Sequence, residues 1–283
     1  MTTHEIKAQS LKIVTNLDEV FSWTKGLQSF GLKFIHLASG FLFPLLVLGI
    51  WQLTFEKNWL PEQILPPPTL VWQTFWELFD SGDLGSNLSI SLQRIFWSVL
   101  IGGSVGLLIG FAVGLSKRAY AYIYPTFDVV SQFPVVGWIP LLTIFLGIDE
   151  PLKIAAISLA VIVPVTVNTY KGIRNIPQSL VEVGRVYQFN VWQKFVRIVL
   201  PAALPNIFSG IRQGVMQAWL SLVFVELLAS SEGIGYLMVW GRQLLQMDIV
   251  FIGIIVIGAV GLILDYVLRF AESRLQTWRQ QAF

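Results

Sequence analysis

Long apolar stretches recur along this chain and are separated by shorter polar segments. A helix needs about 20 mostly apolar residues to cross the bilayer core. The predicted spans are residues 35–55, 88–115, 120–148, 153–170, 201–228 and 249–268. We expect the third to be kinked or broken, because Asp128, Pro134 and Pro140 interrupt it. The pattern predicts an all-α, polytopic membrane protein with about six transmembrane helices.

Charged residues between the spans indicate the orientation. Basic residues follow the second, fourth and sixth spans, at Lys117-Arg118, at Lys171 with Arg174, and at Arg269. The segment from residue 56 to residue 83 is mostly acidic, and Asp149-Glu150 follows the third span. Because Lys and Arg concentrate in cytoplasmic loops, we expect both termini in the cytoplasm.

Three regions follow from this topology. They are an N-terminal cytoplasmic segment (1–34), a transmembrane domain (35–271) and a cytoplasmic tail (272–283). The apolar spacing in residues 11–34 fits an amphipathic helix on the membrane surface, and a frayed tail fits equally well. After the outer Leu65-Pro66-Pro67-Pro68 stretch, a short surface helix ending at Ser81-Gly82 is expected, with one apolar face formed by Leu70, Val71, Phe75, Leu78 and Phe79.

Composition supports a membrane protein and narrows the chemistry. Hydrophobic residues make up 54% of the chain and charged residues only 13%, against about a quarter charged in soluble domains. The net charge of +2 argues against a nucleic-acid partner. With no cysteine and only His4 and His36, the chain offers no pattern for a metal site or for a catalytic group. A phosphate-binding loop needs a Gly-Lys pair, which is absent, so we expect no bound cofactor.

The second span carries four glycines at an unbroken four-residue period. They are Gly102, Gly106, Gly110 and Gly114. Such a stripe clears one helix face of side chains, so that another backbone can approach closely. We expect this face to pack against another helix of the protein, whose identity the sequence does not give.

Residues 171–200 form the one long polar segment between spans. Apolar residues fall at helical spacing on either side of Gln188-Phe189-Asn190, which predicts two short helices joined by a tight turn. Asn190 and Gln193 suit a reciprocal cap at the start of the second helix, and Leu200-Pro201 is where we expect the chain to turn back into the bilayer. An amphipathic hairpin of this length favours docking of a soluble partner over a plain connector.

This segment resembles the EAA loop of permease subunits in bacterial ABC importers. The pattern is matched by Glu182-Val183-Gly184, Gln188, Ile198 and Leu200-Pro201. Val183 and Gly184 stand where the family has alanines. Gln188 stands where it usually has Gly, and a left-handed turn is less easily adopted there.

The resemblance extends from about Trp59 to Asp265 and is closest to the aliphatic sulfonate branch, with nitrate, bicarbonate and taurine permeases nearby. It is carried by Ile64-Leu65-Pro66, residues 145–150, Asn168-Thr169, residues 172–176, residues 200–205 and residues 233–237. It implies a MetI-like permease fold in the inner membrane. It also implies that the 171–200 coupling loop contacts an ATPase subunit through Glu182, Gly184, Arg185, Gln188, Phe189, Leu200 and Pro201.

By the same resemblance, the assembly would contain two copies of this chain, two cytoplasmic ATPase subunits that hold ATP and Mg, and an extracytoplasmic substrate-binding protein. The anion crosses between spans, and polar residues at membrane depth are the candidates for its path. They are Arg94, Asn168, Thr169, Arg212, Trp219, Ser221 and Glu226. For each of them, a helix-packing or snorkelling role is the structural alternative.

Two other classes of function stay open on the residues alone. An intramembrane enzyme would need paired aspartates, and Asp128 with Asp265 is the available pair, but neither lies in a motif for such chemistry. The second is an energy-coupling scaffold without a transport path. Substrate uptake that depends on a co-expressed ATPase would separate the transporter from the enzyme.

Overall fold

The computed structural model describes residues 42–275, which are helical with no β-strand in that range. The chain forms two compact units, residues 1–68 and 69–283. The predicted N-terminal segment (1–34), the start of the first span (35–41) and the end of the tail (276–283) lie outside the described residues. In the first unit, the helix Leu42–Glu56 covers the described part of the first predicted span, and the Trp51 indole N–H donates to the carbonyl of Pro66.

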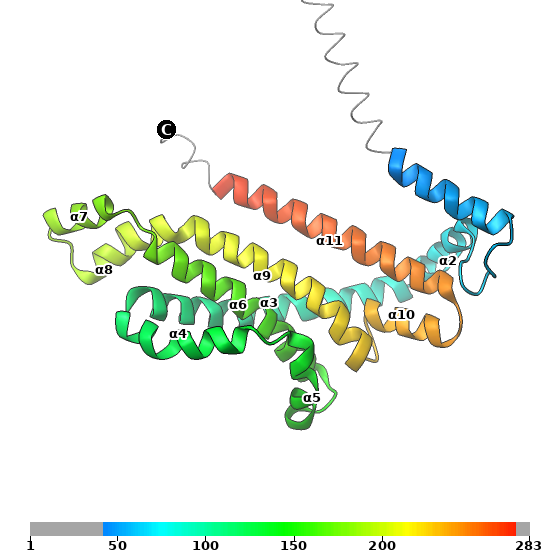
Figure 1. Ribbon diagram of the computed structural model, residues 1–283, viewed down its shortest axis with the longest axis horizontal. Coiled ribbons are helices and arrows are strands. Elements are labelled where there is room, and N and C mark those ends of the chain that lie inside the picture. The colour runs from blue at the N-terminus through cyan, green and yellow to red at the C-terminus, as the bar shows by residue number, and fades with distance from the viewer. Residues whose placement is uncertain (1–41, 276–283) are drawn as a thin grey trace, which may run out of the picture. The chain divides into compact units, whose positions relative to one another are not determined.

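The second unit is a sequence of helices connected by short turns (Figure 1). They are α2 (Pro68–Asp80), α3 (Asp83–Leu115), α4 (Lys117–Ser131), α5 (Val135–Leu146), α6 (Glu150–Arg174), α7 (Gln178–Val186), α8 (Val191–Lys194), the π-helical η1 (Phe195–Val199), α9 (Leu200–Ala229), α10 (Ile234–Gln243) and α11 (Met247–Leu275).

Four helical segments in the described range are long and apolar enough to cross a membrane. They are α3, α6, the continuous run Val191–Ala229, and α11 up to Arg274. The α4–α5 pair makes a fifth span if the two count together, although they meet at a 99° bend. The bend lies at Gln132, Phe133 and Pro134, and the predicted break in the third span is therefore confirmed.

The short helix after the prolines is also confirmed, but its predicted face is partly wrong. Helix α2 ends at Asp80, just before the left-handed Gly82. It buries Val71, Thr74 and Leu78, whereas Phe79 is 57% exposed. The spacing of apolar residues predicted that Phe75 and Phe79 would lie on the buried face. In the structure the smaller, polar Thr74 lies on that face instead.

Helix α6 is the centre of the second unit. It packs against both α3 and α9, and 56% of its most apolar 18-residue stretch is buried, more than in the other long helices of the described range. The four glycines of α3 supply the contact with α6. A Cβ at Gly102 would meet the Ser158 carbonyl at 2.5 Å, and one at Gly110 would meet the Thr169 Cβ at 2.6 Å. The partner of the glycine stripe is thus α6.

Neighbouring glycines of α3 allow a matched test of this packing. Gly102→Ala should destabilise the protein by about 1–3 kcal/mol, because the added methyl meets backbone that cannot rotate away. Gly103→Ala adds the same methyl where nothing lies within 4 Å, and should be neutral or slightly stabilising. Thermal unfolding in detergent measures both, and equal midpoints for the two variants would contradict the close α3–α6 contact.

Candidate functional site

Helices α7 and α8 form a hairpin at one end of the second unit, and α10 lies at the other end (Figure 1). The two helices and the tight turn between them agree with the prediction from the sequence. The predicted cap is also confirmed: the Asn190 side chain accepts from the Gln193 amide at 2.7 Å, and the Gln193 side chain accepts from the Asn190 amide at 3.0 Å. This reciprocal pair starts α8 where the chain leaves the turn.

The turn itself is left-handed at Gln188, with φ of 51°. The Phe189 amide donates to the Gly184 carbonyl, and the Gln188 amide donates to the Arg185 carbonyl. These two bonds are the Schellman pattern that ends a helix, in which glycine is the usual residue at the left-handed position. Gln188 therefore adopts the left-handed backbone conformation that a residue with a Cβ disfavours. The turn has the same geometry that it would have with glycine at this position.

Gln188→Gly should stabilise the hairpin by about 1 kcal/mol, because glycine relieves the left-handed strain of a residue with a Cβ. Amides of α7 should then exchange with solvent about fivefold more slowly if they open by local unfolding. Gln193→Gly is the control, since it removes half of the cap and places glycine in a helix; it should speed exchange. Faster exchange in Gln188→Gly would show that the strain is absent.

The hairpin is packed on its inner side and apolar on its outer side. Gly184 is buried, and a Cβ there would meet Ile198 at 2.6 Å. Arg197 lies over the Phe189 ring at 5.3 Å. The apolar side chains that remain exposed on the hairpin include Leu180, Val183, Val186, Tyr187, Val191 and Trp192, with Val191 at 86% and Val186 at 79%. Exposed apolar groups on a polar element indicate a surface that binds a partner.

Polar residues of the predicted ATPase interface surround this apolar surface. Glu182, Arg185 and Gln188 are exposed and Phe189 is half-buried. No ion pair involves Glu182 among the described residues, so its carboxylate is available to a partner. Leu200 and Pro201 lie further along, at the start of α9.

The expected turn at Leu200-Pro201 is wrong. Helix α8, η1 and α9 form one run of 39 residues, Val191–Ala229, and the Leu200 amide donates to the Phe195 carbonyl within it. Proline lacks an amide hydrogen and its ring collides with the carbonyl four residues earlier. A wider π-helical turn just before the proline accommodates both effects, and the helix continues without a break.

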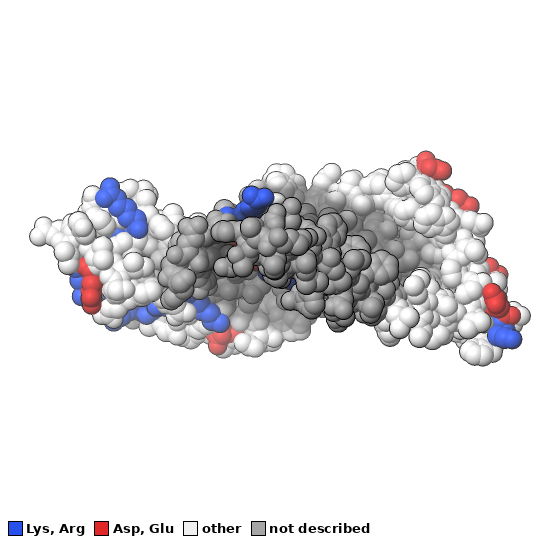
Figure 2. Space-filling view, turned by 90° about the horizontal axis from the view of Figure 1, so that it is seen from above, with Lys and Arg blue, Asp and Glu red and all other residues white. Residues whose placement is uncertain are grey.

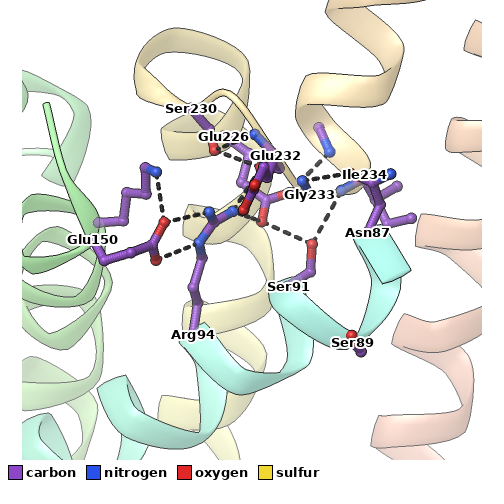
Figure 3. A network of polar contacts seen from close by, with 12 residues as sticks. Asn87, Ser89, Ser91, Arg94, Glu150, Glu226, Ser230, Glu232, Gly233 and Ile234 are labelled. Atoms are coloured by element: carbon purple, nitrogen blue, oxygen red, sulfur yellow. Dashed lines mark hydrogen bonds and ion pairs between the residues drawn. The ribbon is translucent and has the colours of Figure 1, made fainter. Parts of the chain in front are cut away.

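A second polar cluster is buried at the end of the unit that carries α10 (Figure 3). Arg94 of α3 is only 2% exposed. Its Nε and Nη2 atoms donate to the two carboxylate oxygens of Glu150 at 2.9 and 2.6 Å, and Nη1 donates to Glu226 at 2.7 Å and to the Glu232 carbonyl at 2.8 Å. Lys153 adds a contact of 2.7 Å to Glu150. Two cations thus face two carboxylates.

The same cluster caps the start of α10. The first amides of a helix have no partner inside the helix. Here the Gly235 amide donates to Glu226, the Ile234 amide to Ser91 and the Gly233 amide to Asn87. Ser91 also donates to Glu226 at 2.7 Å. Side chains of α3 and α9 therefore hold α10 in place, and Gly233, with φ of 107°, makes the turn into it.

The structure separates the predicted path residues into two groups. Arg94, Thr169, Trp219 and Glu226 are buried within the chain. Thr169 lies against Gly110, and the Trp219 indole donates to the Ile257 carbonyl of α11 at 3.2 Å. These contacts give each of the four a packing role.

Asn168, Arg212 and Ser221 are partly exposed. The Asn168 amide donates to the Gln213 side chain at 3.0 Å. Arg212 forms ion pairs with Asp265 and Glu272 of α11. Asp265 therefore pairs with Arg212, and not with Asp128 as an intramembrane enzyme would require. In residues 42–275, no three His, Cys, Asp or Glu side chains are grouped so as to hold a metal ion.

Apolar helices packed around α6, with a polar hairpin at one end, define a polytopic α-helical membrane protein. This chain belongs to the family of binding-protein-dependent transport system inner membrane components, whose model matches residues 102–277. The matched range includes the hairpin, the capped α10 and all of α11.

Curated relatives cover most of the chain. It is 40% identical over 240 residues to the "Putative aliphatic sulfonates transport permease protein SsuC" of Bacillus subtilis, which covers 85% of this chain and 87% of the relative. It is 33% identical over 236 residues to the nitrate import permease protein NrtB of a Synechocystis species, which covers 80% and 85%.

Solved structures match the fold at low sequence identity. An amino acid ABC transporter aligns with a TM-score of 0.59 and 17% identity over 72% of this chain and 97% of that chain. The MetNI methionine ABC transporter, in an inward-facing conformation, aligns with a TM-score of 0.52 and 16% identity over 65% and 90%. The predicted all-α, MetI-like permease fold is confirmed.

Proposed function

We propose that this chain is the transmembrane permease subunit of an ABC importer for a small anion, with an aliphatic sulfonate favoured over nitrate, bicarbonate or taurine. The family is one of binding-protein-dependent transport. The substrate preference is supported by the higher identity to the sulfonate relative, 40% against 33% for the nitrate permease.

The observation that carries the proposal is the α7–α8 hairpin. It presents exposed apolar side chains beside Glu182, which has no ion pair within residues 42–275, and its second helix, α8, continues through η1 into α9. A soluble ATPase that bound this surface would move the hairpin and α9 as one body. Transport would then follow from rigid-body tilting of spans, with no catalytic group in the chain.

The orientation and the partners follow from the same hairpin. Figure 2 shows Lys and Arg side chains over the end of the molecule that carries α7 and α8. By the positive-inside rule this end lies in the cytoplasm, with both termini on that side of the inner membrane. We infer a dimer of this chain, two ATPase subunits that hold ATP and Mg at the hairpins, and a substrate-binding protein at the opposite face.

The partly exposed residues are the better candidates for the path of the anion. A guanidinium pairs well with sulfonate or carboxylate oxygens, and Arg212 is 27% exposed in its ion pairs with α11. Asn168 and Ser221 offer neutral hydrogen-bonding groups. In contrast, the buried cluster around Arg94 and Glu226 stabilises the outer end of the same helices.

Uptake into proteoliposomes tests the proposal. The chain would be reconstituted with its partner ATPase and substrate-binding protein, and uptake of radiolabelled ethanesulfonate would be measured. We expect uptake that requires ATP and stops with a hydrolysis-deficient ATPase. In separate assays, excess unlabelled nitrate, taurine or bicarbonate would be added as a competitor of ethanesulfonate uptake.

The outcomes are distinct. Stronger competition by nitrate than by unlabelled ethanesulfonate would replace the sulfonate assignment but keep the importer. Loss of all ATP-dependent uptake, despite an intact complex of permease and ATPase, would contradict the importer itself.

A further inference from the structure

Helix α2 has three distinct faces, each made by residues at helical spacing. The first face is buried and consists of Val71, Thr74 and Leu78. The second is aromatic and exposed, with Trp72 at 62%, Trp76 at 44% and Phe79 at 57%. The third is polar and exposed, and consists of Thr69, Gln73, Glu77 and Asp80. One face thus contacts protein, and the other two face different surroundings.

The aromatic face is a continuous layer of rings. The rings of Trp72 and Trp76 pack edge to face with 5.7 Å between their centroids, and those of Trp76 and Phe79 pack in the same way with 5.6 Å between theirs. The half-buried Phe75 contacts all three rings, at 5.6 to 6.3 Å. Because these rings already pack against one another, their side chains would lose little conformational entropy on insertion into an apolar phase.

Two connections place α2 at the edge of the bilayer. The Thr74 hydroxyl donates to Asp248 at 2.6 Å, and Asp248 is the second residue of the span α11. Asp80, the last residue of α2, is followed after Ser81 and Gly82 by the first residue of the span α3. Both spans begin at this level, so α2 lies where water meets the apolar core.

Tryptophan is enriched at that level, because its ring is apolar and its indole N–H is polar. An amphipathic helix at the interface buries its apolar face by about 5–10 Å and keeps its polar face in water. The aromatic and polar faces of α2 lie side by side, as this arrangement requires. The acidic side chains Glu77 and Asp80 would remain on the aqueous side, away from anionic lipid.

We propose that α2 is an interfacial anchor whose Trp72, Trp76 and Phe79 insert into the lipid surface on the side of the membrane where α3 and α11 begin. The buried face holds the helix to the bundle through Thr74 and Asp248. The anchor would set the depth at which α3 and α11 enter the bilayer.

Spin labels on single cysteines test the proposal, because the natural chain contains no cysteine. The full chain would be placed in nanodiscs of mixed phosphatidylethanolamine and phosphatidylglycerol. Two pairs of adjacent positions would be labelled: Trp72→Cys against Gln73→Cys, and Phe79→Cys against Asp80→Cys. The second pair leaves both tryptophans in place, so that it still reports if loss of Trp72 disturbs the helix.

Collisions with oxygen, which enters lipid, are compared with collisions with a nickel chelate, which stays in water. We expect the ratio of oxygen to nickel collisions to be several-fold higher at positions 72 and 79 than at 73 and 80. Equal ratios within each pair would overturn the anchor. Low collision rates with both reagents at 72 and 79 would also overturn it, since they would mean that protein, such as a second copy of the chain, covers the aromatic face.

Discussion

Arg94→Ala is expected to lower the stability of the permease by about 3–5 kcal/mol, the usual cost of removing one partner from a buried ion pair. Glu226 is 1% exposed in the natural chain, and without Arg94 its negative charge would be stabilised only by Ser91 and the Gly235 amide. Glu150 is half exposed and would keep its ion pair with Lys153, so water can solvate its charge when Arg94 is absent. Thermal unfolding in detergent should show a large drop in the midpoint.

Arg269→Ala is the matched control for this variant. Arg269 pairs with Asp265 one turn away on α11, but its side chain is 65% exposed, and such pairs contribute about 0–1 kcal/mol. The double variant Arg94→Met with Glu226→Gln should recover part of the loss, because it removes both charges together. Similar midpoints for Arg94→Ala and Arg269→Ala would show that the buried cluster does not stabilise the end of the bundle that carries α10.

Glu182→Lys should leave folding and membrane insertion intact but weaken binding of the ATPase by roughly 30-fold, about 2 kcal/mol. The residue is exposed and has no ion pair in the described range, so the change does not disturb the hairpin. On the proposed docking surface, a reversed charge would repel the group that the carboxylate would otherwise pair with. Co-purification of the ATPase with the tagged permease measures the loss.

Glu77→Lys provides the same charge reversal at an exposed site on α2, far from the hairpin in the chain. It should copurify with the ATPase as the natural chain does. If Glu182→Lys also retained normal copurification, the hairpin would not be the docking site, and the fold would need another contact for its ATPase.

Features that depend on neighbouring residues could be predicted from the sequence. The cap formed by Asn190 and Gln193 needs only two side chains three residues apart. The break near Pro134 and the end of α2 before Gly82 depend on backbone limits of single residues. The period of the glycine stripe marks a packing face, although nothing local could indicate that α6 covers it.

Contacts between distant segments could not be predicted. Arg94 and Glu226 were each visible as polar residues in apolar spans, but their pairing depends on how α3, α6 and α9 assemble. Reasoning from one span at a time therefore made them candidates for a transport path. The amides of residues 233–235 gave no signal at all, since backbone donors look alike in every sequence.

At two positions a residue preference is overridden, and at one of them, Pro201, the expectation from the sequence is wrong. Gln188 adopts a left-handed turn despite its Cβ, because two backbone hydrogen bonds and the packing of Gly184 hold the chain there. Pro201 does not end a helix, because the π-helical turn before it makes room for the ring. In both places the backbone geometry around the residue offsets an intrinsic cost of about 1–3 kcal/mol.

The helical run Val191–Ala229 has its first residue in the hairpin and holds Glu226, the cap of α10, in its final turn. Its 39 residues follow a helical path of about 58 Å, nearly twice the thickness of the apolar core. A tilt of about 5° around its midpoint would move each end by at most about 2.5 Å. If a bound ATPase displaces the hairpin, the same helical run carries that displacement to Glu226 and therefore to the start of α10.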